Sequence, residues 1–224
     1  MILQIIIFIL PVLSAYLIVS RFTRISDILD KFLMTALLLS AQVVLVAEIL
    51  SLFHRLTAGY FLAGVGSIFL GIFLLLDKKE IFTVLASDIR QSRQYLSRFC
   101  QYLREDSLLG IFYMVIIFSI IYRIFLIVYV PSNNWDALSY HLSRPAYWIQ
   151  NHSINHYFTH FWGQSIYPLN GEIFFLWTMI SSRTDCFAGF IQLAGYLLTG
   201  LLIFQGTKYF LNSKTIPALY TAGL

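Results

Sequence analysis

Long apolar runs alternate with short polar segments along almost the whole chain. Runs of about the length that spans a bilayer cover residues 2–20, 32–53, 60–76, 108–130, 166–182 and 187–205. Because a helix of about 20 apolar residues crosses the hydrocarbon core, each run predicts a membrane-spanning helix. The last run, residues 215–224, is too short to cross, so we expect the chain to be truncated at its C-terminal end. The pattern as a whole predicts an all-α, polytopic membrane helix bundle.

The composition agrees with a membrane protein. Hydrophobic residues make up 58% of the 224 residues and charged residues only 12%, whereas soluble domains carry about 25% charged residues. This balance excludes a water-soluble globule. The first run has no basic segment before it and no small-residue cleavage site after it, so we expect a retained span and not a signal peptide.

The basic residues indicate how the helices are oriented. The net charge is +4, and six Lys and Arg residues lie between residues 77 and 107, whereas Arg144 is the only one between residues 130 and 171. Because cytoplasmic segments are enriched in Lys and Arg, we expect residues 77–107 inside and residues 131–171 outside. Six spans would then place the turn over residues 183–186 inside. Since these basic residues flank spans, we expect no nucleic-acid partner.

The chain therefore divides into three predicted parts. Residues 1–76 form a three-span block, residues 77–107 a cytoplasmic amphipathic linker, and residues 108–224 a membrane core with an external loop at 131–171. In the linker, apolar residues such as Ile81, Leu85 and Ile89 recur between basic ones. Two interpretations stay open: a helix on the membrane surface whose basic face meets anionic lipids, or a solvated connector. Cys100 in this linker and Cys186 near a membrane boundary are expected to be ordinary thiols.

The external loop is the richest part of the chain in polar chemistry. Four of the five histidines lie there, among many aromatic and amide side chains. A simple connector needs only a few polar residues, so this loop predicts a folded site at the membrane face.

One juxtamembrane helix is predicted within the loop, over residues 135–150. Asn134 or Asp136 would cap it. At helical spacing, Asp136, Tyr140 and Arg144 share one face. Pro145 lacks a backbone donor and predicts a kink near Arg144.

Two interpretations of Asp136 remain open. It could simply cap the helix, or it could be a general base or metal-binding carboxylate, with Arg144 holding a phosphate. Glu172, which opens the following apolar run, could likewise cap a helix or face a cavity. His152, His156 and His160 are four residues apart and invite a zinc interpretation, but poor helix formers separate them and no further ligand completes the set.

Residues 135–150, followed by Tyr167-Pro168 and Gly171-Glu172, resemble the GT-C glycosyltransferases, in the bacterial branch related to protein mannosyltransferases. In that superfamily the first large external loop follows a membrane helix, begins with an acidic residue and forms juxtamembrane helices. The resemblance implies transfer of a sugar from a polyprenyl-phosphate donor to an acceptor on the outer face. It also implies an integral protein of the bacterial plasma membrane, surrounded by membrane lipids.

The resemblance further implies which residues form the site. Asp136 takes the position of the catalytic acid, where it would deprotonate the acceptor, and no metal ligand is assigned, although a divalent metal cofactor is left open. The expected substrate-binding residues are Tyr140, His141, Arg144, Gln164 and Glu172.

Two other functions remain as alternatives. A transporter or flippase of lipid-linked sugars is favoured by the many spans and by Glu48 and Arg123 within them. A non-catalytic membrane protein of envelope assembly is the second. Transporters usually place their polar sites near the middle of the bilayer, whereas here the polar residues gather in an external loop, which favours the enzyme.

Overall fold

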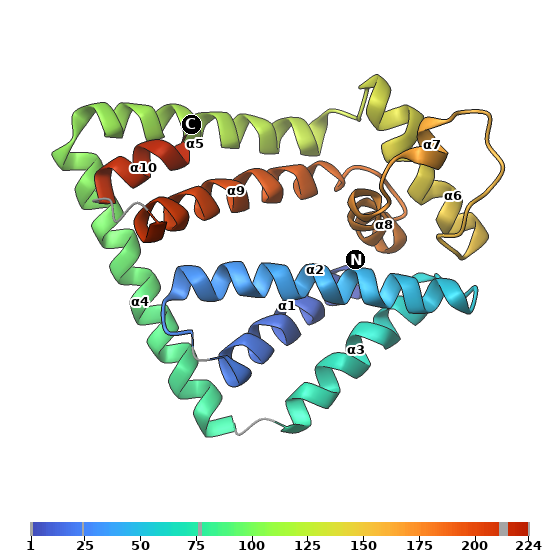
Figure 1. Ribbon diagram of the computed structural model, residues 1–224, viewed down its shortest axis with the longest axis horizontal. Helices are drawn as coiled ribbons and strands as arrows, with labels where there is room; N and C mark the ends of the chain where they lie inside the picture. Colours follow the sequence, from blue (N-terminus) through green and yellow to red (C-terminus); the bar gives the residue numbers. More distant parts are fainter. Residues whose placement is uncertain (1, 24, 76–77, 211–214, 224) are drawn as a thin grey trace.

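The protein is a bundle of long helices, and residues 130–188, which carry only short helices, interrupt the series (Figure 1). The computed structural model describes residues 2–23, 25–75, 78–210 and 215–223, and no strand occurs in these ranges. The helices are α1 (Ile2–Phe22), α2 (Ile28–Leu52), α3 (Ala58–Leu75), α4 (Lys78–Glu105), α5 (Ser107–Tyr129), the π-helix η1 (Ala137–His141), α6 (Ser143–Asn151), α7 (Gly163–Ile166), α8 (Asn170–Ser182), α9 (Gly189–Phe210) and α10 (Thr215–Gly223). The all-α prediction is confirmed.

Five of the described helices, α1, α2, α3, α5 and α9, are long and apolar enough to cross a membrane. Each has 18 residues or more in its apolar stretch, which at 1.5 Å per residue approaches the hydrocarbon thickness of about 30 Å. The chain is therefore consistent with a multi-pass membrane protein.

Acidic side chains mark where two of these helices begin. The Asp27 carboxylate accepts hydrogen bonds from the backbone N–H groups of Leu29 and Asp30, and Asp106 accepts one from Leu109. Each bond satisfies a donor that the first helical turn leaves without a partner. Thus the few acids near the apolar runs set the helix boundaries.

The helix α8 differs from the prediction for residues 166–182. The apolar run is broken at Tyr167–Leu169, and α8 has only 13 residues, or about 20 Å, which is too short to cross a bilayer. Most of its side chains are buried in protein, and Trp177 donates from Nε1 to the carbonyl of Ile7 at 3.3 Å. The predicted span is therefore wrong, because apolar length alone does not separate a lipid-facing helix from one buried in protein.

This shorter helix changes the path of the chain. Figure 1 shows α8 end-on, between α9 and α2, at the end of the bundle that carries α6 and α7. The turn that follows it, at Arg183–Asp185, lies beside residues 56–58 and α6. From there α9 runs back to the opposite end, where Gln205 donates to Asp30 at 2.7 Å. The prediction that residues 183–186 share a side with residues 77–107 is therefore wrong.

The first three helices form the main apolar core. The Cβ of an alanine at Gly64 would lie 2.9 Å from Val46, so glycine allows α2 and α3 to approach closely. The same core includes Trp148 of α6 and Leu176 of α8. The loop after α5 and the helix α8 are thus packed onto the first three helices.

The predicted amphipathic linker forms one continuous helix, α4. It passes across the ends of α2 and α9 at the left of Figure 1. A buried ion pair joins it to α2, since Lys31 Nζ lies 2.7 Å from the carboxylate of Asp88.

Candidate functional site

The segment after α5 places Asp136 at an exposed edge of the molecule. The Asn134 side-chain oxygen accepts a hydrogen bond from the backbone N–H of Asp136 at 2.9 Å, so Asn134 supplies the cap. Asp136 itself has helical backbone angles and makes no capping hydrogen bond. The interpretation of Asp136 as an N-cap is therefore wrong, and its exposed carboxylate is available for chemistry.

The single helix predicted over residues 135–150 is interrupted. Residues 137–141 form a π-helical turn, in which the N–H of Leu142 donates to the carbonyl of Ala137 at 2.9 Å. The helix α6 starts afresh at Ser143, with Pro145 in its first turn, where a missing N–H costs no hydrogen bond. The break lies two residues before the predicted kink at Arg144. Such π-helical turns are frequent at functional sites.

Arg144 is buried and ties α6 to the segment that leads into α8. Its side chain donates from Nε to the carbonyl of Gln164 at 2.7 Å and from Nη2 to the carbonyl of Tyr167 at 3.0 Å. The guanidinium also lies over the ring of Trp148, 5.7 Å from its centre. Only 1% of Arg144 is exposed, so it acts as an internal clamp on the loop.

Glu172, in the first turn of α8, supplies the charge opposite Arg144. Its Oε1 lies 3.0 Å from His141 Nδ1, and its Oε2 lies 3.7 Å from Arg144 Nη1. These last two atoms are buried and have no hydrogen-bond partner among the described residues. The two buried charges therefore stabilise one another by Coulomb attraction, and His141 completes the contact of η1 with α8.

The side-chain amide of Gln164 forms four hydrogen bonds. Its Nε2 donates to the carbonyl of Ser139 at 2.6 Å and to the hydroxyl of Ser143 at 2.9 Å. Its Oε1 accepts from the hydroxyls of Tyr157 at 3.1 Å and Thr159 at 2.9 Å. Every donor and acceptor of the amide is used, so Gln164 fixes the loop to η1 and α6.

Aromatic rings pack around Tyr140, one turn after Asp136. The ring centres of Tyr140 and Tyr167 are 4.9 Å apart, and Phe161 lies beyond at 6.4 Å. Desolvation raises the pKa of the Tyr140 hydroxyl, and the nearby negative charge of Asp136 raises it further. Tyr140 therefore stays a neutral hydrogen-bonding group beside the Asp136 carboxylate.

The predicted site residues thus fall into two groups. His141 and Arg144 both contact the Glu172 carboxylate, while Gln164 and Tyr140 are linked to them through the loop backbone and ring contacts. Asp136 is not in this buried network but stands exposed at its edge.

A groove of about 780 Å³ lies next to this network, and sequence reasoning missed most of its lining. Three segments far apart in the chain meet there, from the α2–α3 turn, from η1 and α6, and from the α8–α9 turn. The lining is Leu56, Thr57, Ala58, Leu138, Leu142, Ser143, Ala146, Ile149, Gln150, His152, Met179, Ile180, Arg183, Thr184 and Asp185. Within the sequence, only the polar turn after α8 pointed to this groove. Its position there could not be predicted as long as residues 166–182 were expected to cross the membrane.

Metal-binding groups do not gather in the described part of the chain. No group of three His, Cys, Asp or Glu side chains is arranged to hold an ion there. His152 ends α6 in the left-handed conformation, with φ of 53°, and the chain through His156 and His160 is not helical. The three histidines are therefore not aligned on one helix face.

Comparison of the chain with protein-family models, with curated proteins and with solved structures finds no match.

Proposed function

We propose that this protein is an integral membrane glycosyltransferase. It moves a sugar from a polyprenyl-phosphate donor to an acceptor hydroxyl at the end of the bundle that carries residues 131–171. The observation that carries the proposal is the exposed Asp136 carboxylate at the start of η1, a segment that also contributes Leu138 to a largely apolar groove. The resemblance of residues 135–150 to the GT-C loop points to the same residue.

The reaction needs one base. The Asp136 carboxylate takes the proton of the acceptor hydroxyl as the hydroxyl oxygen attacks the anomeric carbon of the sugar. The bond between that carbon and the phosphate oxygen breaks, and the polyprenyl phosphate leaves with the bonding electrons. Because the glycosyl phosphate already carries a good leaving group, the second carboxylate of a glycosidase has no counterpart here.

The groove has the chemistry that a lipid phosphate requires. Leu138, Leu142 and Ile149 line it with apolar surface suited to an isoprenoid chain, while Arg183 and His152 supply cationic and hydrogen-bonding groups suited to a phosphate. Leu138 lies in η1 two residues after Asp136, so the donor groove and the proposed base belong to the same short segment.

The buried residues behind η1 hold this site in place. Arg144, Gln164 and Glu172 make their contacts within the protein, so we assign them to positioning of η1 and the loop, and Tyr140 and His141 to the surface near the sugar. Sites whose supporting residues are fixed by hydrogen bonds hold catalytic groups more accurately than free loops do.

The side of the membrane follows from the basic residues. Arg90, Arg93 and Arg98 lie on α4, at the end of the bundle opposite η1 and α6. Under the positive-inside rule, α4 is cytoplasmic and the catalytic loop faces outward from a bacterial plasma membrane.

Transport receives less support from the structure. Glu48 of α2 and Arg123 of α5 were the charges within spans that favoured it, and both are exposed on the outside of the bundle. Charges that serve a translocation path line an internal cavity instead.

The test is a sugar-transfer assay on the natural full-length protein in proteoliposomes, with radiolabelled polyprenyl-phosphate sugars. Asp136→Asn keeps the size of the side chain but removes the base, so we expect the transfer rate to fall by about 10²- to 10⁴-fold. Glu48→Gln, an exposed acid of the same bundle, is the matched control and should leave the rate unchanged. Transfer at the wild-type rate by Asp136→Asn would contradict the assignment, and inactivity of the wild type with every donor would favour a scaffold or a transporter.

A further inference from the structure

The helix α4 is held at the membrane boundary by its neighbours in the chain. The spanning helix α3 ends at Leu75 and α4 begins at Lys78, while only Asp106 separates α4 from the spanning helix α5. With 28 residues, α4 is about 42 Å long, enough to pass across several helix ends. Neither of its ends can therefore leave the membrane surface.

Hydrogen bonds along one face fix how α4 is rotated. Asp88, 5% exposed, binds Lys31 Nζ through both carboxylate oxygens at 2.7 and 2.8 Å. Gln91 accepts from the backbone N–H of Ile28 at 2.6 Å, and Tyr95 donates to the Asp27 carboxylate. This face meets α2, so the remaining faces of α4 point away from the bundle.

One flank of α4 is apolar and uncovered. Phe82, Leu85, Ile89 and Leu96 follow one another at spacings of three, four and seven residues, and their exposed fractions run from 40% to 71%. Large apolar side chains arranged in this way on a helix at the membrane boundary suit the interface between headgroups and acyl chains.

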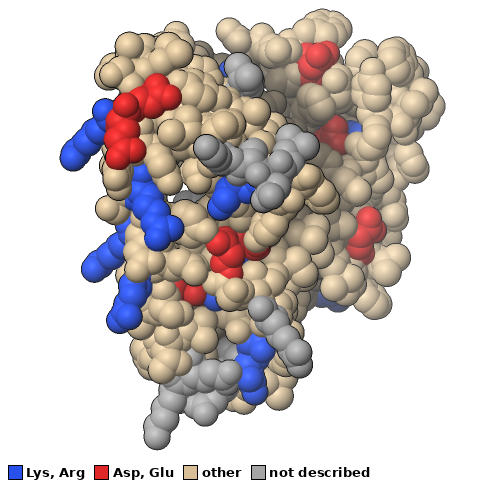
Figure 2. Space-filling model, turned by 60° about the vertical axis from the view of Figure 1, so that its left-hand side comes forward, with Lys and Arg blue, Asp and Glu red and all other residues tan. Residues whose placement is uncertain are grey.

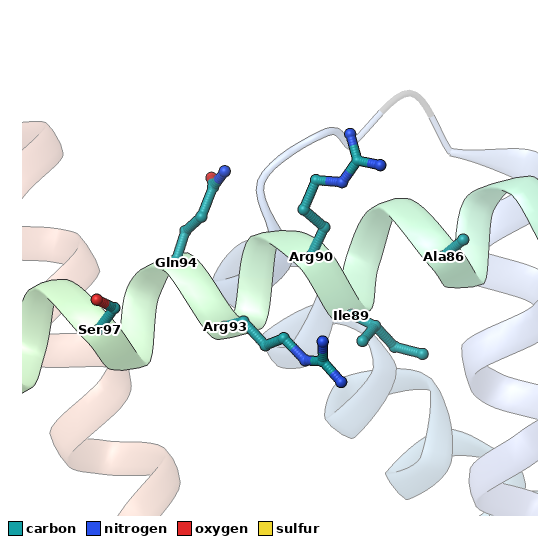
Figure 3. A pocket seen from close by; sticks show the side chains of 6 residues that line it. All are labelled: Ala86, Ile89, Arg90, Arg93, Gln94 and Ser97. Atoms are coloured by element: carbon teal, nitrogen blue, oxygen red, sulfur yellow. The ribbon is translucent and has the colours of Figure 1, made fainter.

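The adjoining outer face of α4 is basic. Arg90 and Arg93 are exposed beside a shallow groove of about 380 Å³, together with Gln94 and Ser97 (Figure 3). In Figure 2 the side of the molecule that carries α4 is turned towards the viewer, and Lys and Arg side chains gather on the left-hand part of this face. Among the side chains that the structure describes, neither arginine forms an ion pair. Between residues 81 and 104 the only acid is Asp88, which Lys31 neutralises.

From these faces we infer that α4 is a binding surface for anionic phospholipids. The guanidinium groups of Arg90 and Arg93 bind the lipid phosphates, and the apolar flank enters the acyl-chain boundary of the same leaflet. Charge complementarity and the position at the membrane edge favour lipid over a soluble polyanion, because a nucleic acid would leave Phe82 and Leu96 in water. The inference does not depend on the proposed enzymatic activity.

The experiment measures lipid binding to the detergent-solubilised full chain by native mass spectrometry. Phosphatidylglycerol and phosphatidylcholine with identical acyl chains are titrated separately, so that only the headgroup charge differs. We expect phosphatidylglycerol to bind more tightly, and Arg90→Gln or Arg93→Gln to reduce that preference about five-fold each, since a basic residue near an anionic surface contributes about 1 kcal/mol. The double variant should have little preference left.

The control is Arg55→Gln, which removes an exposed arginine at the opposite end of the bundle. It should keep the wild-type preference, and thermal unfolding of each variant shows that the exposed substitutions leave the fold intact. Equal binding of the two lipids by the wild type, or a full preference in the double variant, would overturn the inference. So would displacement of phosphatidylglycerol by millimolar inorganic phosphate, or tight arginine-dependent binding of a short oligonucleotide without lipid preference.

Discussion

At the scale of single residues, the two buried charges Arg144 and Glu172 determine how the loop is held. Their nearest charged atoms are 3.7 Å apart, and only 1% of Arg144 and 2% of Glu172 are exposed. Either charge alone would be costly to bury, whereas together they are tolerated. The arrangement implies that these two residues hold the loop from within, whereas Asp136, which we propose as the base, is exposed.

Removal of the Glu172 charge should destabilise the protein without touching the exposed surface. Glu172→Gln leaves the Arg144 guanidinium buried without a counter-charge, for which we expect a loss of about 3–5 kcal/mol in the free energy of unfolding. The measurement is thermal or denaturant unfolding in detergent. Glu48→Gln, an exposed substitution of the same kind, should change the stability little. Equal stabilities of the two variants would show that the buried pair is not formed.

The sequence could identify these residues but not their roles. The composition of residues 131–171 drew attention to this segment, and the structure places Tyr140, His141, Arg144, Gln164 and Glu172 together. A π-helical turn shifts the face on which Arg144 lies, and helical spacing could not show that it points inward. Nor could a cap by Asp136 be distinguished in advance from one by Asn134 two residues earlier.

At the scale of helices, α4 and α8 show what periodicity can and cannot predict. The spacing of apolar residues predicted α4 because one face of it packs against α2 while basic residues cover another. The α8 run is apolar for a different reason, since α1, α2 and α6 surround it. Composition alone gives the same signal for burial in lipid and burial in protein.

The attachment of α4 to α2 should depend on pH through Tyr95. Desolvation by burial and the hydrogen bond that Tyr95 donates to Asp27 raise the pKa of its hydroxyl in the folded protein. Since the folded pKa is above the unfolded value of about 10, this contribution to stability is complete below pH 10 and is lost as the pH rises towards the folded pKa.

Tyr95→Phe removes the hydrogen bond, so we expect the variant to be less stable than the wild type by about 1 kcal/mol at pH 8. The gap should narrow above pH 10, as measured by denaturant unfolding across that range. Tyr122→Phe changes an exposed tyrosine of α5 and serves as the control. A gap that stays constant up to pH 11 would show that Tyr95 does not stabilise the folded state as a neutral donor.

At the scale of the whole molecule, five helices that are long and apolar enough to cross a membrane separate the two ends of the bundle. Residues 183–186 lie at the end that carries α6, while α4 lies at the opposite end. This differs from the six-span topology that the apolar runs predict, in which both segments share one side. The two topologies can be separated with the native cysteines.

Cys100 of α4 and Cys186 of the α8–α9 turn are both exposed free thiols. We expect a membrane-impermeant maleimide applied to intact cells to label Cys186 in the Cys100→Ser variant. Cys100 in the Cys186→Ser variant should be labelled only after permeabilisation, because the two thiols face opposite sides. Labelling of both from one side would contradict the five-span topology.

The most direct test of the central claim separates donor binding from sugar transfer in Asp136→Asn. With the natural full-length protein and a radiolabelled polyprenyl-phosphate sugar, the variant should bind the donor with nearly wild-type affinity, since the groove does not include Asp136. Release of polyprenyl phosphate in a single turnover with acceptor should fall at least about 100-fold. Release at the wild-type rate, with binding intact, would contradict the assignment of Asp136 as the base.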